Sequence, residues 1–332
     1  MSAAGAAAYW AAEVARTSRA IGREVRVDAC AVLDRSADLP LRRAGLWSPN
    51  RSCRLIAAMD GWLAVNLPRA DDLDLVPAWL GHAVRGDLWR GVVAEVASRP
   101  AMELVDQARL LGLPVARVGE VAPGGPAVAA RPLGVPRLRD GVPRVVDLSA
   151  MWAGPLCGAV LADMGADVTR YEDSRRPDPT RTATPNLYRR LNRRKRHATI
   201  DLGSRSGLAA MAGILAEAHI VITSARSRAF AAWGLNPEVV AGGNPGLTWV
   251  AISGHGWEGD GADRVAFGDD AAAAGGLLRW TRAGAPRFAG DALADPLTGL
   301  AAAAAAMRAW SAGGGVLVDA ALARVAADAV RR

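Results

Sequence analysis

Asp295 is the side chain in this sequence best placed to act as a nucleophile. It precedes Pro296, and an aspartate before a proline is a typical helix start, with the aspartate as N-cap and the proline as the first helical residue. Its neighbours Leu293, Ala294 and Leu297 are apolar or small, which leaves room for a substrate carbonyl group. A carboxylate in such a place can attack an activated acyl group. The structural and the catalytic interpretations of Asp295 are compatible.

A second candidate is the basic run RRLNRRKR at residues 189–196, which holds six cations in eight residues directly before an expected strand. Such a run can be a solvated loop, a nucleic-acid contact or a phosphate site for a small ligand. No aromatic residues are interleaved with it, and no nucleic-acid-binding motif accompanies it. We therefore favour a phosphate cradle formed by Asn192, Lys195 and Arg196.

The turn SAMWAGP at residues 149–155 lies between an expected strand and an expected helix. It lacks the GxGxxG pattern with which a backbone approaches a pyrophosphate, so a nicotinamide site is not expected. Gly154 stands at the helix N-terminus, where backbone N–H groups could meet an anion or a thioester oxygen. A tight turn that needs glycine for close packing explains Gly154 equally well.

Metal chemistry is not expected from the cysteines and histidines. Cys30, Cys53 and Cys157 are too far apart for a CxxC pair and too few for a disulfide framework, which fits a reducing cytoplasm. The four histidines show no HExxH or other paired spacing. We predict no metal site.

The overall composition predicts a folded globular protein. The chain has 332 residues, of which 51% are hydrophobic and 22% charged, enough for one large domain or two. Its net charge of +7 suits phosphate-bearing partners of any kind. The longest uncharged apolar stretch, 296–307, is too short to span a bilayer, and Glu13 and Arg16 interrupt the alanine-rich start. We expect a cytoplasmic protein that does not interact with a membrane.

The second half of the chain alternates strands with helices, which predicts a parallel sheet with helices on both faces. We assign residues 144–332 to a Rossmann-like α/β domain. Its expected strands are 144–148, 166–172, 198–202, 220–223, 247–253 and 316–319, and its clearest helices are 155–164, 268–278 and 296–310.

The first half predicts a smaller mixed α+β domain over residues 1–120. Asp60-Gly61 between two apolar runs is typical of a hairpin turn. The other expected elements are an alanine-rich first helix, strands at 25–33 and 114–118, and helices at 73–80, 88–98 and 102–111. Five prolines within 121–143 block helix and central strand, so this segment is the expected linker.

Five segments follow one another across the second half in a recognisable order. They are VVDLS (145–149) with AGP (153–155), LADMGADV (161–168) with Glu172, LNRRKR (191–196) with IDL (200–202), VAISG (250–254) with Asp263 and Arg264, and ADPLTG (294–299) with GGVLVD (314–319). In this order they resemble the motifs of family III CoA-transferases, the group of formyl-CoA transferase, carnitine CoA-transferase and α-methylacyl-CoA racemase.

The resemblance implies a mechanism and a set of contacts. Asp295 would attack an acyl-CoA thioester to form a mixed anhydride, and the released CoA thiolate would return to form an enzyme–CoA thioester. CoA would be a substrate, with no permanently bound cofactor, a carboxylic acid as the second substrate, and a homodimer as the assembly. Relatives place an arginine at the position of Ala232, and Arg226 or Arg228 is expected to replace it. The implied CoA contacts are Trp152, Gly154, Asn192, Lys195, Arg196, Thr223, Ser224 and Arg228.

Two departures from the family pattern stand out. The segments NRSCR (50–54), AMDGW (58–62) and GLPVA (112–116) resemble the family's small domain, but here they precede the Rossmann-like half. The chain therefore resembles a permuted member or part of a tandem duplication. The glycine-rich loop that shields the active aspartate in formyl-CoA transferase is also missing around residues 46–55.

The racemase branch of the family needs a histidine–aspartate pair that moves a proton. Phe267 and Gly268 occupy those positions here, and neither side chain titrates. His255 could serve only if its loop folds differently. We rank CoA transfer first, acyl-CoA racemisation or isomerisation second, a catalytically incomplete CoA-binding subunit third and nucleic-acid binding last. The acyl group and the acceptor acid are not specified by the sequence.

Overall fold

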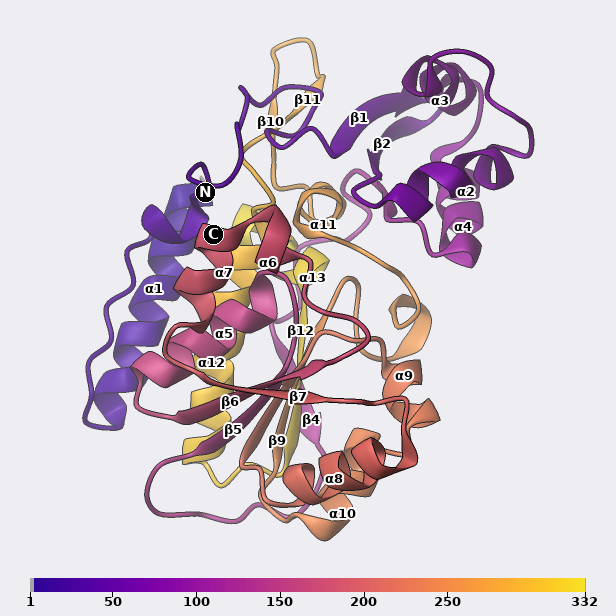
Figure 1. Cartoon of the computed structure of the whole chain (residues 1–332). Coiled ribbons are helices and arrows are strands. Elements are labelled where there is room, and N and C mark those ends of the chain that lie inside the picture. Colours follow the sequence, from indigo (N-terminus) through magenta and orange to yellow (C-terminus); the bar gives the residue numbers. More distant parts are fainter. Residues whose placement is uncertain (1–2, 332) are drawn as a thin grey trace.

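The computed structural model describes residues 3–331, and its largest feature is a seven-stranded sheet (Figure 1). The strand order is β4-β12-β9-β8-β5-β6-β7, and all strands except β4 run parallel. The predicted parallel sheet is confirmed. The strands are β4 Ala129–Pro132, β5 Arg144–Leu148, β6 Asp167–Asp173, β7 Arg196–Ile200, β8 Ile220–Thr223, β9 Thr248–Ser253 and β12 Val316–Ala321.

Helices cover both faces of this sheet, also as predicted. Successive strand residues point to opposite faces, so Val145 belongs to one hydrophobic core and Val146 to another. The first core is completed by α5 (Ala153–Asp163), α12 (Ala294–Ser311) and α13 (Leu322–Arg331). The second is completed by α8 (Arg205–Ala216), α9 (Ser227–Ala232) and α10 (Pro237–Gly243). In such sheets the carboxyl ends of the strands are the usual place for a ligand.

The first helix, α1 (Ala3–Ala20), belongs to the larger core. It packs against α12, and the two helices lie side by side in Figure 1. Its buried Trp10 and Val14 share a hydrophobic cluster with α5 and α12. The sequence analysis assigns the first helix to the small domain, whereas in the structure α1 packs into the core of the large sheet. The division of the chain into domains stays a prediction.

A smaller antiparallel sheet lies beside the large one. It consists of β1 (Cys53–Ala58), β2 (Gly61–Asn66) and β3 (Val115–Arg117), and α2 (Ala70–Leu80), α3 (Leu88–Ala97) and α4 (Ala101–Leu111) pack on it. The predicted hairpin is confirmed, although Ala58 pairs with Gly61, so the loop is Met59-Asp60. Asp60 is held there because its carboxylate accepts a hydrogen bond from the N–H of Ala101 (2.7 Å).

One expectation for the connecting segments is wrong. Residues 25–33 form no strand: Asp28 accepts hydrogen bonds from the N–H groups of Cys30 and Ala31, which turns the chain into the 3-10 helix η1 (Ala31–Leu33). The proline-rich segment 121–143 contains β4, because an edge strand tolerates Pro132 where a central strand does not.

Helix α11 (Gly268–Ala274) joins the two sheets, since it contacts β2 and β3 on one side and α12 and α13 on the other. It ends earlier than the predicted residue 278, because Gly275 and the left-handed Gly276 (φ 74°) follow. A hairpin of β10 (Leu278–Trp280) and β11 (Pro286–Phe288) comes next. The remaining elements are α6 (Thr180–Ala183), α7 (Pro185–Asn192) and η2 (Gly259–Gly261). Within residues 3–331, no helix is both long and apolar enough to cross a membrane.

Candidate active site

Asp295 lies in the first turn of α12, partly buried, but it does not cap the helix. The helix begins at Ala294 with Leu293 as N-cap, and no side chain makes a capping hydrogen bond. The expected N-cap role of Asp295 is therefore wrong, because the helix starts two residues earlier than the aspartate–proline pair predicts. The carboxylate is consequently not engaged by the backbone of its own helix and faces the start of α11.

The backbone of Gly268 forms one wall around this carboxylate. A Cβ atom at Gly268 would lie 2.3 Å from Asp295 Oδ2 and 2.4 Å from the carbonyl oxygen of Ala292. Ala292 itself has a φ of +44°, which is rare for alanine and is held by a hydrogen bond from its N–H to Asp269 Oδ1 (2.8 Å). Such strained residues cluster at functional sites, and here the strained residue sits between two acidic side chains.

Two further carboxylates and two donors surround Asp295. Asn50 donates from Nδ2 to Asp269 Oδ2 and to Asp291 Oδ1, both at 2.7 Å. Arg35 donates to the same Asp291, from Nε to Oδ2 at 2.5 Å and from Nη2 to Oδ1 at 3.2 Å. The acidic cluster thus draws on four separate stretches of the chain.

The cluster changes the acidity of its members. Burial raises the pKa of Asp295 to about 7; Asp269 and Asp291 add to this rise, and the positive charge of Arg35 opposes it. Burial and the charge of Asp291 raise the pKa of Asp269 to about 6, against hydrogen bonds from Asn50 and Ala292. Asp295 can therefore exchange between its neutral and charged forms near neutral pH.

Sequence reasoning missed Arg35, Asn50, Asp269 and Asp291. Asp291 is part of the stretch that contains Asp295, and Asp269 belongs to an acidic pair at an expected helix start, so both carried a weak local signal. Arg35 carried no such signal, because its neighbours in the sequence do not distinguish it from the other arginines.

Lys195 lies in the core beneath the basic run. Its side chain is fully buried and its Nζ donates to Asp147 Oδ2 (2.7 Å), the carbonyl oxygen of Pro155 (2.8 Å) and Asn192 Oδ1 (3.0 Å). These three bonds use all three N–H groups of the lysine, so it offers none to a phosphate group. Burial lowers the pKa of Lys195, while Lys195 and Arg170 hold the pKa of Asp147 below its usual value despite burial.

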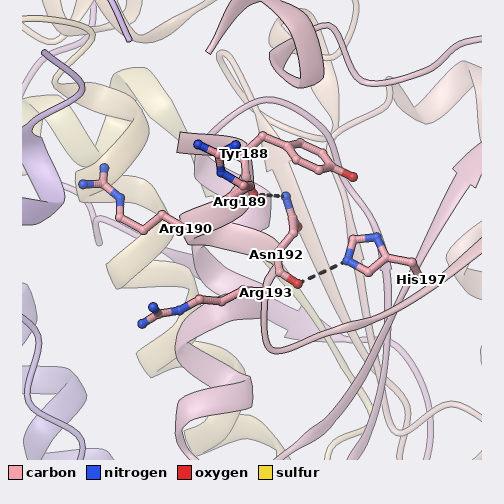
Figure 2. A pocket seen from close by; sticks show the side chains of 6 residues that line it. All are labelled: Tyr188, Arg189, Arg190, Asn192, Arg193 and His197. Carbon is pink, nitrogen blue, oxygen red and sulfur yellow. Dashed lines mark hydrogen bonds between the residues drawn. The ribbon is translucent and has the colours of Figure 1, made fainter. Parts of the chain in front are cut away.

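The predicted phosphate cradle is therefore not formed as expected. Asn192 is also buried and accepts the hydrogen bond from Lys195, whereas Arg196 is exposed and pairs with Asp167 (2.5 Å). Figure 2 shows the outer part of this region, a surface pocket of about 570 Å³. The residues that line it are Tyr188, Arg189, Arg190, Asn192, Arg193 and His197.

Four other predicted CoA contacts shape the loops at the strand ends. A Cβ at Gly154 would lie 2.2 Å from that of Ser149, which supports the close-packing interpretation of this glycine. Ser224 Oγ accepts a hydrogen bond from the N–H of Ala150 (2.9 Å) and so joins the loops after β5 and β8. Thr223 is buried and accepts from the N–H of Ala225, and Trp152 is buried beneath the guanidinium of Arg35 (5.1 Å).

A polar groove of about 660 Å³ lies between the loop after β8 and helices α2 and α4. Arg69, Arg109, Arg226 and Arg228 line it together with several aspartates, and Arg228 is 3.6 Å from Asp263. Burial and the nearby Arg228 lower the pKa of Arg226. The guanidinium of Arg69 stacks on Phe267 (5.6 Å), the residue directly before Gly268. This contact connects a residue that lines the groove to the segment that contains Gly268.

His255 does not join the acidic cluster. Its side chain is only 4% exposed, its Nδ1 is 3.8 Å from Glu120, and both ring nitrogens lack a hydrogen-bond partner within the described residues. Burial and the charge of Arg264 lower its pKa to about 3, so the ring is neutral. Phe267 stands at the N-cap of α11. No His, Cys, Asp or Glu cluster within residues 3–331 has the arrangement of a metal site.

The sequence model of CoA-transferase family III matches residues 140–331, more than half of the chain. The chain belongs to this family. Succinyl-CoA–D-citramalate CoA-transferase of Chloroflexus aurantiacus is 34% identical over 199 residues, which are 55% of this chain and 49% of that protein. Succinate–glutarate CoA-transferase of Agrobacterium fabrum is 34% identical over 198 residues, 54% of this chain and 50% of that protein.

A solved structure agrees with the fold. A CAIB/BAIF family protein from Brucella suis is 31% identical, with a TM-score of 0.51 over 57% of this chain and 54% of that chain. The chain spans about half the length of the curated relatives it matches. The resemblance deduced from the five sequence segments is confirmed, and the matched region includes Asp295.

Proposed function

We propose that this protein transfers coenzyme A between an acyl-CoA thioester and a carboxylic acid, with Asp295 as the nucleophile. The observation that carries the proposal is the placement of Asp295 in a member of CoA-transferase family III: a partly buried carboxylate, not used as a helix cap, whose pKa is raised to about 7. A carboxylate with little solvation is a stronger nucleophile than a fully hydrated one.

In the first half-reaction the Asp295 carboxylate attacks the thioester carbonyl carbon, which forms a mixed anhydride and expels the CoA thiolate. The thiolate then attacks the Asp295 carbonyl carbon, which forms the enzyme–CoA thioester and releases the first acid as its carboxylate. In the second half-reaction the acceptor carboxylate attacks this thioester and expels the thiolate. The thiolate takes the new acyl group from the anhydride, and Asp295 is regenerated as a carboxylate.

For CoA we propose the groove that holds Arg226 and Arg228. Its arginines suit the phosphates of CoA, and the contact between Arg69 and Phe267 points the pantetheine arm toward Gly268 and Asp295. Lys195 and Asn192 then act beneath the site as positioning residues, and Trp152, Gly154, Thr223 and Ser224 shape the loops beside it. We propose that Arg228 takes the role of the arginine that relatives have at the position of Ala232.

For the substrates we propose a dicarboxylic acid and its CoA thioester. The relatives named above carry succinyl-CoA, citramalate, succinate and glutarate in their names. Other relatives, from Chloroflexus aurantiacus, are named as alpha and beta subunits of a succinyl-CoA–L-malate CoA-transferase. A homodimer and a pair with a second chain are therefore both proposals for the assembly, and size measurement of the purified protein separates them.

The test follows oxygen atoms. The protein is incubated with succinyl-CoA and glutarate labelled with oxygen-18 in its carboxylates, and the peptide that contains Asp295 is weighed. In the proposed chemistry the bridging oxygen of the second anhydride comes from glutarate and stays with Asp295. Each turnover therefore places one heavy oxygen in the Asp295 carboxylate, and repeated turnover labels both of its oxygens. Asp295→Asn abolishes both transfer and labelling, whereas Asp260→Asn, in the exposed 3-10 helix η2, retains both.

Two results would contradict the proposal. Transfer at the wild-type rate by folded Asp295→Asn would remove the nucleophile, and CoA binding without transfer in any panel of acids would leave a CoA-binding subunit. Exchange of the α-proton of a 2-methylacyl-CoA with deuterated water, with no acceptor acid present, would indicate racemisation instead. The structure offers little support for that exchange, because His255 is buried away from Asp295's acidic neighbours.

A further inference from the structure

A segment near the N-terminus, residues 28–39, crosses the large unit and will be called the strap. Asp38 in the strap accepts hydrogen bonds from the N–H groups of Asn186 (2.7 Å) and Leu187 (2.8 Å), which are among the unpaired donors of the first turn of α7. Arg190 of α7 donates to the carbonyl oxygens of Ala31 (3.1 Å) and Asp34 (2.7 Å). The strap is thereby tied at both ends to one helix of the large unit.

Between these ties the strap inserts Arg35 into the acidic cluster. The side chain of Arg35 is 15% exposed, its guanidinium lies over the ring of Trp152, and it forms an ion pair with Asp291. Asn50 fixes the other side of that Asp291. The indole ring of Trp152 and the carboxylate of Asp291 thus fix the guanidinium of Arg35. Binding a substrate would therefore cost this side chain little further conformational entropy.

The hydrogen bonds of Arg35 leave part of its guanidinium for a ligand. Within residues 3–331, its recorded bonds use Nε and Nη2, while Nη1 carries two further N–H groups. A planar guanidinium edge with N–H groups of this kind matches a carboxylate. The same charge acts on Asp295, since Arg35 opposes the rise of the Asp295 pKa.

The charge of the site changes during the proposed reaction. In the free protein, Arg35 faces the Asp295 carboxylate together with Asp269 and Asp291. Once Asp295 has become a thioester it carries no charge, and the attraction between Arg35 and Asp295 is lost. The next step needs a new carboxylate next to the Asp295 carbonyl carbon. The carboxylate of an incoming acid would restore this attraction and would arrive at the reacting atom.

We propose that Arg35 binds the reacting carboxylate of the acceptor acid when Asp295 carries the CoA thioester. This inference rests on the proposed function and goes beyond it, because it assigns acid binding to a residue outside the part of the chain that matches the family model. The strap is then a component of the active site: it supplies the acid-binding side chain from a position in the chain 256 residues before Asp291.

The test separates binding of the acid from formation of the acyl-enzyme. Arg35→Met, Arg35→Lys and wild type are each compared on the alkaline plateau of their own pH profile, because Arg35 opposes the rise of the Asp295 pKa and its loss would raise that pKa further. The first measurement is hydroxylamine trapping from succinyl-CoA alone, which needs no acceptor. The second is the KM for glutarate at saturating succinyl-CoA. Arg26→Met is the matched control, because Arg26 is close to the strap in sequence, its side chain is 83% exposed and, among residues 3–331, it pairs only with Glu24.

We expect Arg35→Met to raise the KM for glutarate by about tenfold or more, the loss of a charge-assisted hydrogen-bonded contact, and to leave trapping within about threefold. Arg26→Met should change neither. If Arg35→Met does not fold, Arg35→Lys decides the question: it still neutralises Asp291 but lacks the guanidinium edge, so its KM for glutarate should rise as well.

Three results separate this inference from the proposed function. An unchanged KM for glutarate in a folded Arg35 variant would overturn the role of Arg35 and leave the transferase intact. An equal fall in trapping and in transfer would also overturn it, because Arg35 would then only position Asp295. Absence of trapping in the wild type would instead contradict the proposed function itself.

Discussion

Gly268 offers the sharpest test of how the site is built. A methyl group added at this position would lie 2.3 Å from Asp295 Oδ2 and 2.4 Å from the carbonyl oxygen of Ala292, where ordinary contacts are 3.4–4 Å. Gly268→Ala therefore requires movement of about 1 Å in the Asp295 carboxylate, in the strained Ala292 backbone or in both. We predict a large loss of activity from a change of one methyl group.

The magnitude follows from the sensitivity of catalysis to position. A displacement of about 1 Å of a reacting group costs roughly 100-fold in rate, and overpacking of this kind costs about 1–3 kcal/mol of unfolding free energy. We expect Gly268→Ala to lower kcat/KM for CoA transfer by about 100-fold, mostly in kcat, because the nucleophile and not the CoA groove is displaced.

The measurement combines steady-state transfer from succinyl-CoA to glutarate with thermal unfolding. The matched control is Gly213→Ala in α8, where a new Cβ meets nothing within 4 Å. That control should leave kcat/KM unchanged and stabilise the fold by about 0.5–1 kcal/mol, since alanine is the better helix former. A folded Gly268→Ala protein with wild-type kcat/KM would refute the reasoning, because Asp295 would then not depend on the wall that Gly268 forms.

Two further predictions concern the buried charges. Because the pKa of Asp295 is raised to about 7, kcat/KM should fall about tenfold per pH unit below that value. The raised pKa also means that Asp295 binds a proton more tightly in the folded state than in the unfolded state. Asp295→Asn should therefore unfold at a higher temperature than wild type at about pH 8, and this difference should disappear toward about pH 4. An equal gap at both pH values would contradict this assignment. Lys195→Met should lower the free energy of unfolding, measured with denaturant, by about 3–5 kcal/mol, because it leaves Asp147 buried without its ion pair. Adding Asp147→Asn should restore part of that free energy. Arg194→Met should lower it by no more than about 1 kcal/mol, since the pair of Arg194 with Asp163 is exposed. Similar losses in Lys195→Met and Arg194→Met would show that the buried pair is not special.

Local patterns predicted most of the regular structure. The strand–helix alternation from residue 144 onward corresponds to β5, α5, β6 and the elements that follow, because a parallel sheet covered on both faces requires continuous apolar strands. The hairpin between β1 and β2 also carries its signal in adjacent residues. The strand expected at residues 25–33 is wrong because an aspartate-nucleated turn replaces it. The edge strand β4 within 121–143 was not expected, because its pairing with β12 depends on a partner that composition does not reveal.

The basic run shows the limit of reasoning from residue type. Lys195 and Arg196 are neighbours of the same charge, yet one is buried against Asp147 and the other is exposed beside Asp167. Lys195 lies in the turn before β7, whose first residue is Arg196, so the path of this turn and the register of β7 against β6 together decide which cation is available to a ligand. The charge count of the run contains no information about that register.

The sequence by itself determined the order of strands and helices, the membership of CoA-transferase family III and the candidate nucleophile Asp295, since each depends on residues close together in the chain. Only the tertiary structure decided what surrounds that nucleophile. Arg35 and Asn50 reach Asp291 across 256 and 241 residues. Contacts over such distances arise from the packing of whole elements, here the strap on α7 and the small sheet on α11, and packing depends on complementary surfaces that no local periodicity records.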